Sequence, residues 1–413
     1  MSKHNIIAGI DIGNSTVKTI IAEHKDGSER PQILGVGISP SNGLRRGVVV
    51  DMTEAVNDVK NSIAQAEADS GLRVKRSYVS ISGQHVKSQT SRGVIAVSRA
   101  DNEISEYDIQ RVLEAASTIS LPPNREIIHT IPKRFVVDGQ EFVKNPVGMT
   151  GIRLEADVII IDALSPYIKS LAKIVNENDV EVAEFVYAPL AAAKAVLNKR
   201  AREHGALCLD LGGGLCNLAV FEEGELIHTA SLPIGSKNIT NDLAIAVKVS
   251  LEGAEKIKIE HGFVGNSPGG RKETIDISGI ADEEGAVVPK KLIGEVVNDR
   301  VSEITEMVLQ ELKKINRSNT LPAGTILSGG GTKLEGFAEH IKDKLKLPVK
   351  KISSYEFDGA VQKMEDPSFA VAAGLVLWGM EKEFNENEGR FFEGFTSGKA
   401  ANKIKNWMKI FLP

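Results

Sequence analysis

Two stretches about half a chain apart follow one pattern. Residues 9–24 read GIDIGNSTVKTIIAEH, and residues 208–224 read CLDLGGGLCNLAVFEEG. Each places an aspartate between apolar residues, continues with glycine and other small residues, and ends in a second apolar run. When Asp11 is aligned with Asp210, the glycines two residues later also align. Apolar runs joined by such small residues predict β-hairpins. Two copies of one hairpin predict two lobes of related fold that face each other.

The rest of the chain alternates short β-branched runs with stretches of helical periodicity, which is typical of α/β domains. The predicted strands lie at 5–13, 16–24, 77–83, 157–163, 183–189, 206–212, 217–224 and 324–331. The predicted helices lie at 51–69, 105–119, 165–178, 188–204, 239–260, 290–316 and 333–346. A chain of 413 residues can divide into two or more domains.

Composition predicts a cytoplasmic protein. The two cysteines, Cys208 and Cys216, match neither a zinc knuckle nor a CxxC redox pair, so we expect buried, unreactive thiols in a reducing compartment. The first apolar run is interrupted by Asp11 and is too short for a signal sequence or a spanning helix. A net charge of −5 predicts no general attraction to nucleic acid or to anionic membranes.

The turns of both hairpins carry the residues of an anion-binding cradle, because successive backbone N–H groups in a tight turn point at an anion and small side chains leave room for it. The cradle residues are Gly13, Asn14, Ser15, Thr16 and Lys18 in the first hairpin, and Gly212, Gly213 and Gly214 in the second. Asp11 and Asp210 are placed to hold the waters of a hydrated Mg²⁺ ion. One such turn fits an ordinary hairpin equally well, whereas two matched copies favour phosphate binding. The Walker and GxGxxG patterns are absent.

A third glycine-rich turn, ILSGGGTKLEG at 326–336, follows a predicted strand and precedes a predicted helix. A further helical stretch, AEKIKIEHG at 254–262, carries Glu255 and Lys258 on one face. On spacing alone, these two residues are interpreted as a solvated ion pair.

In this order along the chain, the motifs resemble those of the actin superfamily, whose two lobes clasp ATP between two such hairpins. The matching segments are 9–18 and 208–220 for the phosphates, 326–336 for adenosine, and 187–197 and 367–379 for the connecting helices. Within the superfamily the chain is similar to the FtsA family of bacterial division proteins, because 84–165 resembles the insertion that this family calls subdomain 1C. ISGQHV, EISEYDIQRVLEAA, LPPNREIIHTIPKRFVVDGQ and NPVGMTGIRLEADV carry that resemblance.

The resemblance implies an α/β fold of two actin-like (ribonuclease H-like) lobes with the inserted subdomain 1C, followed by a disordered linker and a C-terminal amphipathic helix. The implied divisions are 1–83, 166–204 and 350–383 for the first lobe; 84–165 for the insertion, with polymerisation and later divisome contacts; 205–238 and 301–349 for the second lobe; 239–300 for a small subdomain over the adenine; 384–398 for the linker; and 399–413 for the helix.

The resemblance also implies the ligands, ATP and Mg²⁺, and the residues that hold them. Asp11, Gly13, Asn14, Ser15, Thr16 and Lys18 of the first hairpin would contact the β- and γ-phosphates, and Gly212 to Gly214 would lie opposite them. Asp11 and Asp210 would hold Mg²⁺ through water. Glu255 and Lys258 would lie near the ribose and adenine. The residues against the nucleoside would be Gly329, Gly330, Gly331 and Lys333.

The implied function is that of an ATP-binding adaptor that polymerises on the cytoplasmic face of the cell membrane and tethers FtsZ filaments at the division site. The C-terminal peptide of FtsZ would dock on 239–300 and its flanking helix, where Arg300 and Glu303 match a polar pair that the family uses.

The chain departs from the family in two places. Asp157 and Ile160 stand in LEADVIIIDA, where many members read LEVxxHIIT. No carboxylate or amide occurs between Phe185 and Lys194, where actin-like ATPases orient the attacking water. We therefore expect ATP to act as a conformational ligand with slow turnover at most.

The chain ends in NKIKNWMKIFLP at 402–413. On a helical projection an apolar stripe is flanked by lysines. The stripe contains Ile404, Trp407, Met408 and Phe411, and the lysines are Lys403, Lys405 and Lys409. An element that folds back onto the core and a partner-binding helix are alternatives, but aromatic rings combined with lysines favour an in-plane anchor on anionic lipid. Each anchor would bind weakly, and polymerisation would supply avidity.

Two other classes fit a two-lobed ATP-binding fold. A pilus-assembly adaptor like PilM also binds ATP, but that family does not normally need its own C-terminal anchor. A sugar-kinase-type phosphotransferase needs an aspartate base that faces a sugar pocket, and the insertion and the missing base argue against that class.

Overall fold

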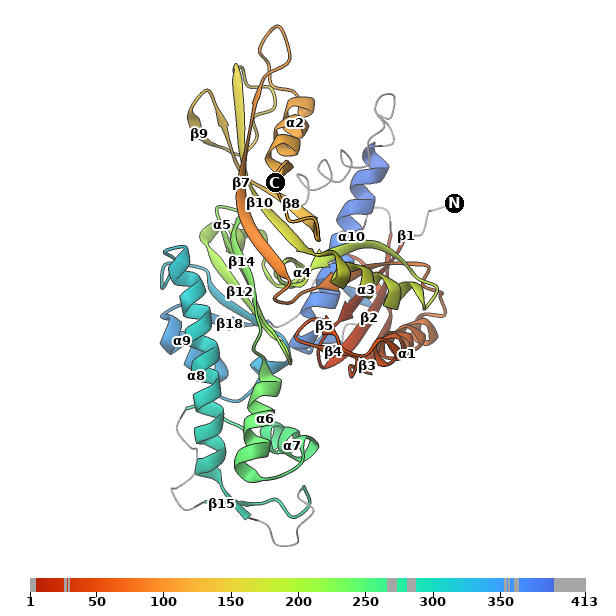
Figure 1. Ribbon diagram of the computed structural model, residues 1–413, viewed down its shortest axis with the longest axis vertical. Helices are drawn as coiled ribbons and strands as arrows, with labels where there is room; N and C mark the ends of the chain where they lie inside the picture. Colours follow the sequence, from red (N-terminus) through yellow and green to blue (C-terminus); the bar gives the residue numbers. More distant parts are fainter. Residues whose placement is uncertain are drawn as a thin grey trace.

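The computed structural model describes residues 5–25, 28, 30–265, 273–280, 287–352, 355, 357–359 and 364–389. Figure 1 shows two central sheet-containing lobes, a sheet-and-helix unit at the top of the view and a largely helical unit at the bottom.

The first lobe is built on a six-stranded sheet with the order β11-β6-β1-β2-β3-β19. Its strands are β1 (Asn5–Ile12), β2 (Thr16–His24), β3 (Gln32–Pro40), β6 (Arg76–Ile81), β11 (Glu181–Tyr187) and β19 (Asp358–Gly359). β1 is antiparallel to β2 and parallel to β6, which is parallel to β11. A small hairpin of β4 (Leu44–Arg45) and β5 (Val48–Val49) follows β3.

The second lobe repeats this arrangement. Its sheet has the order β14-β13-β12-β17-β18, with strands β12 (Ala206–Leu211), β13 (Cys216–Glu222), β14 (Glu225–Leu232), β17 (Gly324–Ser328) and β18 (Val349–Lys351). β12 is antiparallel to β13 and parallel to β17, which is parallel to β18. Strand order and direction therefore match β3-β2-β1-β6-β11. The duplicated hairpins predicted from the sequence are confirmed as the central strands of two related sheets.

Helices pack on both faces of the first sheet and join the lobes. They are α1 (Met52–Ser70), α3 (Ser165–Asn176), α4 (Ala188–Val196), α5 (Lys199–His204), the short η3 (Pro367–Phe369) and α10 (Ala370–Gly389). α10 and α4 approach closely, because a Cβ added to Gly374 would overlap the backbone of Ala191. Small residues at this contact let the two connecting helices pack backbone to backbone.

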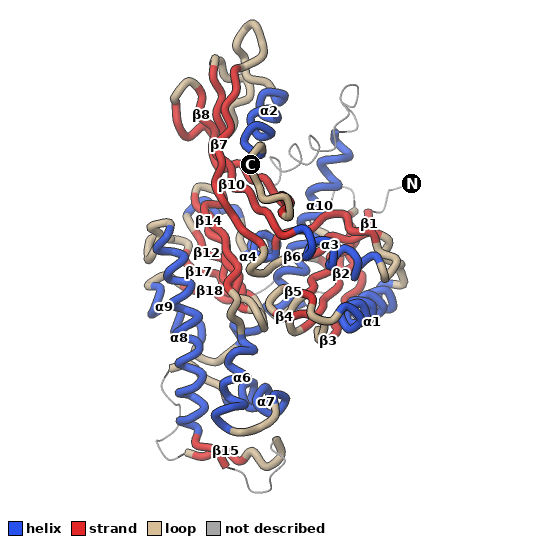
Figure 2. Tube along the Cα trace, viewed as in Figure 1, coloured by secondary structure: helices blue, strands red, loops and turns tan. Residues whose placement is uncertain are grey.

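The insertion forms a separate sheet, β7-β10-β8-β9, at the top of Figures 1 and 2. Its elements are β7 (Val86–Ala96), α2 (Glu106–Ser117), β8 (Arg125–Val137), β9 (Gln140–Val143) and β10 (Arg153–Leu164). α2 packs on one face through a core that includes Val112, Leu113 and Phe135. This α2 begins with a capping box in which Ser105 and Asp108 bond each other's backbone N–H groups.

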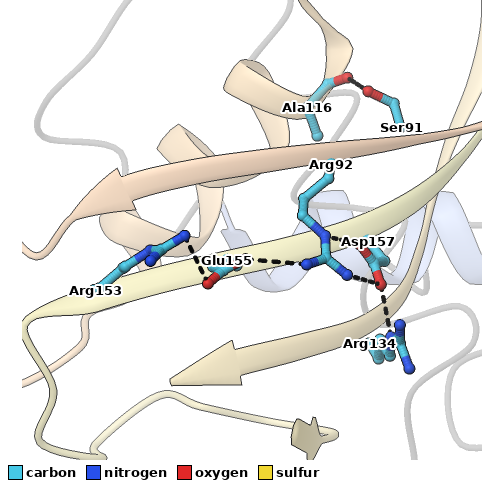
Figure 3. Close-up of polar contacts among 7 residues, drawn as sticks. All are labelled: Ser91, Arg92, Ala116, Arg134, Arg153, Glu155 and Asp157. Carbon is cyan, nitrogen blue, oxygen red and sulfur yellow. Dashed lines mark hydrogen bonds and ion pairs between the residues drawn. The ribbon is translucent and has the colours of Figure 1, made fainter. Parts of the chain in front are cut away.

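The other face of that sheet carries a layer of charged side chains (Figure 3). Asp157 accepts hydrogen bonds of 2.6 Å from Nε of Arg92 and from Nε of Arg134. Glu155 pairs with Arg92 at 3.3 Å and with Arg153 at 3.0 Å. The carboxylate of Asp157, which departs from the family pattern, is thus hydrogen-bonded by two arginines on the neighbouring strands.

The unit at the bottom of Figure 1 extends from the second lobe. It contains α6 (Ser236–Val247), α7 (Leu251–His261), the small pair β15 (Thr274–Asp276) and β16 (Val287–Pro289), and the first half of α8 (Lys290–Lys314). The second lobe is completed by η1 (Gly330–Lys333) and α9 (Phe337–Leu345). One hydrophobic core runs from the second sheet through α8 into this unit.

Several predicted elements differ from those observed. The helices predicted at 188–204 and 239–260 are each two helices, because Asn198 and Ser250 N-cap new helices and Lys248 ends α6 in the left-handed conformation. Strands β3, β7, β8, β14 and β18 were not predicted. The linker predicted at 384–398 begins inside α10, which continues to Gly389.

The rest of that predicted linker, from 390, and the whole tail at 399–413 lie outside the described residues. Among the described helices, none is both long enough and apolar enough to span a membrane.

Candidate functional site

The two hairpin turns face each other across a cleft of about 560 Å³. Both turns are closed in the same way, by an N–H···O bond of 3.2 Å from Gly13 to Thr16 and of 2.9 Å from Gly212 to Leu215. All the residues predicted to bind the nucleotide line this cleft except Gly214. Gly214 lies instead against the opposite hairpin, where an added Cβ would be 2.9 Å from Cγ of Asn14.

Asp11 and Asp210 occupy equivalent positions in the two sheets. Oδ1 of Asp11 accepts a 2.8 Å hydrogen bond from the hydroxyl of Ser80 on β6. Oδ1 of Asp210 accepts a 3.3 Å hydrogen bond from the hydroxyl of Ser328 on β17, and its Oδ2 accepts one of 3.1 Å from Asn217. In each lobe the serine lies on the parallel strand next to the aspartate. The duplicated fold thus aims two similarly supported carboxylates into one cleft.

Burial dominates the electrostatics of these carboxylates. It raises the pKa of Asp11, an effect that Lys18 and Ser80 partly offset. Burial, together with the nearby charge of Asp11, raises the pKa of Asp210 to about 6, against the opposing effect of the Asn217 hydrogen bond. Burial lowers the pKa of Lys18, whose Nζ donates to Oγ1 of Thr16 at 2.7 Å. The two hairpins therefore hold two acids that ionise reluctantly, together with the desolvated Lys18.

These residues fit a hydrated cation. The described residues include no cluster of three or more His, Cys, Asp or Glu side chains that could hold a metal directly. Two carboxylates facing one cleft suit instead a Mg²⁺ ion that keeps most of its waters, which is the usual form of this ion beside phosphates.

On the far side of the cleft, Lys258 is at the centre of a polar group. Its Nζ donates to Oε2 of Glu255 at 2.7 Å and to Oγ1 of Thr240 at 2.9 Å. The lysine is buried, with 7% of its surface exposed, and burial lowers its pKa. Spacing alone favoured a solvated ion pair, but the structure places Lys258 inside the cleft wall.

The third turn completes the wall. Gly329 has φ of 86°, a conformation that favours glycine, and a Cβ there would lie 2.7 Å from Oδ1 of Asp210. Lys333 pairs with Asp366 at 2.7 Å, and both line the cleft. The glycine turn therefore lies directly against the aspartate of the second hairpin.

Sequence reasoning missed the supporting residues Ser80, Ser328, Asn217, Thr240 and Asp366. A signal for the two serines was present, because each lies near the middle of a predicted strand, within three residues of a glycine. Their pairing with the aspartates depends on parallel strand neighbours, which no local pattern reveals.

The residues predicted to bind the FtsZ peptide lie together on α8, outside the cleft. Arg300 forms two hydrogen bonds to Asp242 on α6, of 2.6 and 3.0 Å, and also pairs with Glu303. The residues predicted to bind the membrane, from Lys403 to Phe411, lie outside the part of the chain that the structure describes.

Two family models match the chain. The model described as "SHS2 domain inserted in FTSA" matches residues 83–162, and "Cell division protein FtsA" matches residues 207–374. Among curated relatives, the cell division protein FtsA of Borreliella burgdorferi is 35% identical over 405 residues, covering 98% of each chain. FtsA of Pseudomonas aeruginosa is 33% identical, covering 92% of this chain and 90% of the relative.

Solved structures show the same fold at low identity. A "PilM-PilN type IV pilus biogenesis complex" matches with a TM-score of 0.67 at 17% identity, covering 91% of this chain and 98% of the other. MreB 5 of Spiroplasma citri bound to AMPPNP matches with a TM-score of 0.54 at 14% identity, covering 93% and 99%. These likenesses establish the actin-like fold, and the PilM match carries no functional argument at this identity. From its sequence relatives, the chain belongs to the FtsA family of cell-division proteins.

Proposed function

We propose that this cell-division protein binds ATP with a hydrated Mg²⁺ ion between its two hairpins and serves as a membrane adaptor for the division ring. In this proposal it polymerises on the cytoplasmic face of the membrane and tethers FtsZ filaments there through their C-terminal peptide. The observation that carries the nucleotide part is the matched pair of carboxylates, Asp210 buried and Asp11 half-buried, each supported by a serine, on two glycine-rich turns that share one cleft.

The residues divide the binding task. The turn N–H groups and Lys18 would contact the phosphates, while Asp11 and Asp210 would orient the waters of the cation. Glu255, with Lys258, would contact the ribose and adenine beside the third glycine turn. The cation would supply the positive charge that the two carboxylates and the phosphates both need.

ATP is expected to act mainly as a conformational ligand. α4, which borders the cleft at Ala188, has the sequence APLAAAKAV and offers neither a carboxylate nor an amide side chain to activate water. Because this wall of the cleft offers no group to activate water, ATP hydrolysis should be slow at most.

The membrane part of the proposal rests on the sequence of the tail. The test is co-sedimentation of the full chain and of residues 1–398 with vesicles containing phosphatidylglycerol, with phosphatidylcholine vesicles as the control. The full chain should sediment with the anionic vesicles and the truncated chain should stay in solution. Undiminished binding of the truncated chain would refute the assignment of the tail as the anchor.

The nucleotide part is tested separately, by titrating the full chain with a fluorescent ATP analogue in the presence of Mg²⁺. Saturable binding that unlabelled ATP displaces is expected. Failure to bind would refute this part and leave the result of the vesicle experiment unchanged.

A further inference from the structure

Lys237, in the first turn of α6, contacts both phosphate hairpins. Its backbone N–H donates a 2.8 Å hydrogen bond to the carbonyl of Gly213 in the second hairpin. Its Nζ donates a 2.7 Å hydrogen bond to the carbonyl of Asn14 in the first hairpin. This pair of contacts, here called the Lys237 bridge, ties together two turns that belong to different lobes. The sequence had not singled out this residue.

Both ends of the bridge are held in place. On the second lobe, the N–H of Ser236 donates to the carbonyl of Gly212 at 2.9 Å, so the start of α6 is fixed to the hairpin turn. On the first lobe, Oδ1 of Asn14 accepts a 2.9 Å hydrogen bond from the N–H of Gly47. If the two hairpins move apart, the hydrogen bond from the ammonium of Lys237 to Asn14 must break.

The ammonium group of Lys237 now donates to a backbone carbonyl, which is a weaker acceptor than the phosphate of a nucleotide would be. Burial and the nearby charges of Lys258 and Arg45 lower the pKa of Lys237, while Glu255 opposes that effect. The carbonyl of Asn14 is neutral. The ammonium is charged in both cases, but a phosphate oxygen also carries negative charge, which adds a Coulombic attraction that the neutral carbonyl lacks. A polyphosphate lying between the hairpins would therefore compete for this ammonium, or share it with the carbonyl.

The number of phosphates on the nucleotide decides whether its terminal phosphate reaches the Lys237 bridge. In the proposed orientation the nucleoside lies by the third glycine turn and the phosphates point toward the hairpin turns. Each added phosphate extends the chain away from the nucleoside, so the terminal phosphate of a triphosphate lies farther between the turns than that of a diphosphate.

We propose that Lys237 recognises the terminal phosphate of a nucleoside triphosphate and holds the two lobes together when that phosphate is bound. Lys237 would then make the site bind triphosphates more tightly than diphosphates. It would also hold the two hairpins in position when the cleft closes. This inference rests on the proposed nucleotide function, and it assigns to one residue of the same site the difference between the triphosphate and diphosphate states.

The test compares K237M with the wild-type chain. Methionine keeps the length and the apolar stem of the side chain but removes the ammonium. K256M is the matched control, because Lys256 is exposed on α7 between Glu255 and Lys258 and has no bridging contact in the described structure. Dissociation constants are measured for fluorescent analogues of ATP and ADP with Mg²⁺, and thermal unfolding midpoints check that the variants are folded.

In K237M, affinity for the triphosphate should fall about tenfold or more, while affinity for the diphosphate changes little, because one charged hydrogen bond is lost. K256M should bind both nucleotides like the wild type, and K237R should keep most of the discrimination. An equal loss for ATP and ADP, or an equal effect of K256M, would overturn the inference. If the wild-type chain bound neither nucleotide, the proposed function itself would fail, which is a distinct result.

Discussion

Replacing Asp210 with asparagine should make the protein without added nucleotide more stable at neutral pH and should weaken its binding of Mg²⁺ and ATP. Asp210 is 6% exposed and lies near a second carboxylate, that of the half-buried Asp11. A residue kept ionised in such a place opposes folding, so removing its charge should stabilise the folded protein.

The size of the effect follows from the pKa of Asp210, which rises from 3.8 to about 6 on folding. Because the folded-state value is the higher one, the folded protein holds the proton more tightly, and stability falls as the pH rises from about 4 to about 6. Above that window the penalty is complete, at about 3 kcal/mol for roughly two pKa units. Asparagine removes this penalty but loses one acceptor toward Asn217 or Ser328, at a cost of about 1 kcal/mol. The net gain in the free energy of unfolding is about 2 kcal/mol at pH 7.5.

The assay is urea unfolding followed by circular dichroism at pH 4.5 and pH 7.5 for the wild type, D210N and the control D101N. Asp101 is an exposed aspartate whose pKa is lowered, chiefly by a hydrogen bond from the backbone of Glu103, so D101N should not become more stabilising as the pH rises. The gain for D210N should appear at pH 7.5 and shrink or reverse at pH 4.5. If D210N is destabilised equally at both pH values, the reasoning from desolvation is wrong.

Three further predictions concern the cleft and the outer face of α8. G213A should weaken ATP binding by about 5- to 150-fold, the equivalent of about 1–3 kcal/mol of overpacking, because its Cβ would overlap the serine hydroxyl of the opposite hairpin. G279A, outside the cleft, should bind ATP like the wild type, since no atom lies within 4 Å of its added Cβ; an equal loss of affinity in G213A and G279A would contradict this reasoning. R300A should weaken binding of an FtsZ C-terminal peptide by about tenfold in fluorescence anisotropy, whereas K313A at the C-terminal end of α8 should not. Chelating Mg²⁺ should abolish ATP binding measured by calorimetry, and unchanged binding in chelator would refute the role given to the carboxylates.

The sequence predicted the duplicated hairpins well because their signal is local. The aspartate, the glycine two residues later and the returning apolar run all lie within one β1–β2 or β12–β13 unit, and the register pairs Asp11 with Lys18 and Asp210 with Asn217. The glycines of the third turn were also found locally, because Gly329 needs a positive φ that few other residues adopt.

What the sequence did not predict depends on contacts between distant segments. Ser80 reaches Asp11 through parallel pairing of β6 with β1, and Lys237 reaches Asn14 across 223 positions of chain. The helix predicted at 239–260 breaks at Lys248 because that residue adopts a left-handed conformation, which helical periodicity does not record. Neither a strand neighbour nor a left-handed lysine has a local pattern in the sequence.

The two hairpins are related in fold but differ in chemistry, and the difference explains why the site should need a cation. Opposite the aspartate, the first hairpin has Lys18 and the second has Asn217. When both carboxylates are ionised, they therefore outnumber the lysine between them, and burial already raises the pKa of both acids. A polyphosphate entering alone would add like charge to this place and increase the repulsion. A divalent cation would relieve the repulsion between the carboxylates and between them and the phosphates. The duplication that builds two cradles thus also builds a charge imbalance, which Lys18 alone cannot neutralise.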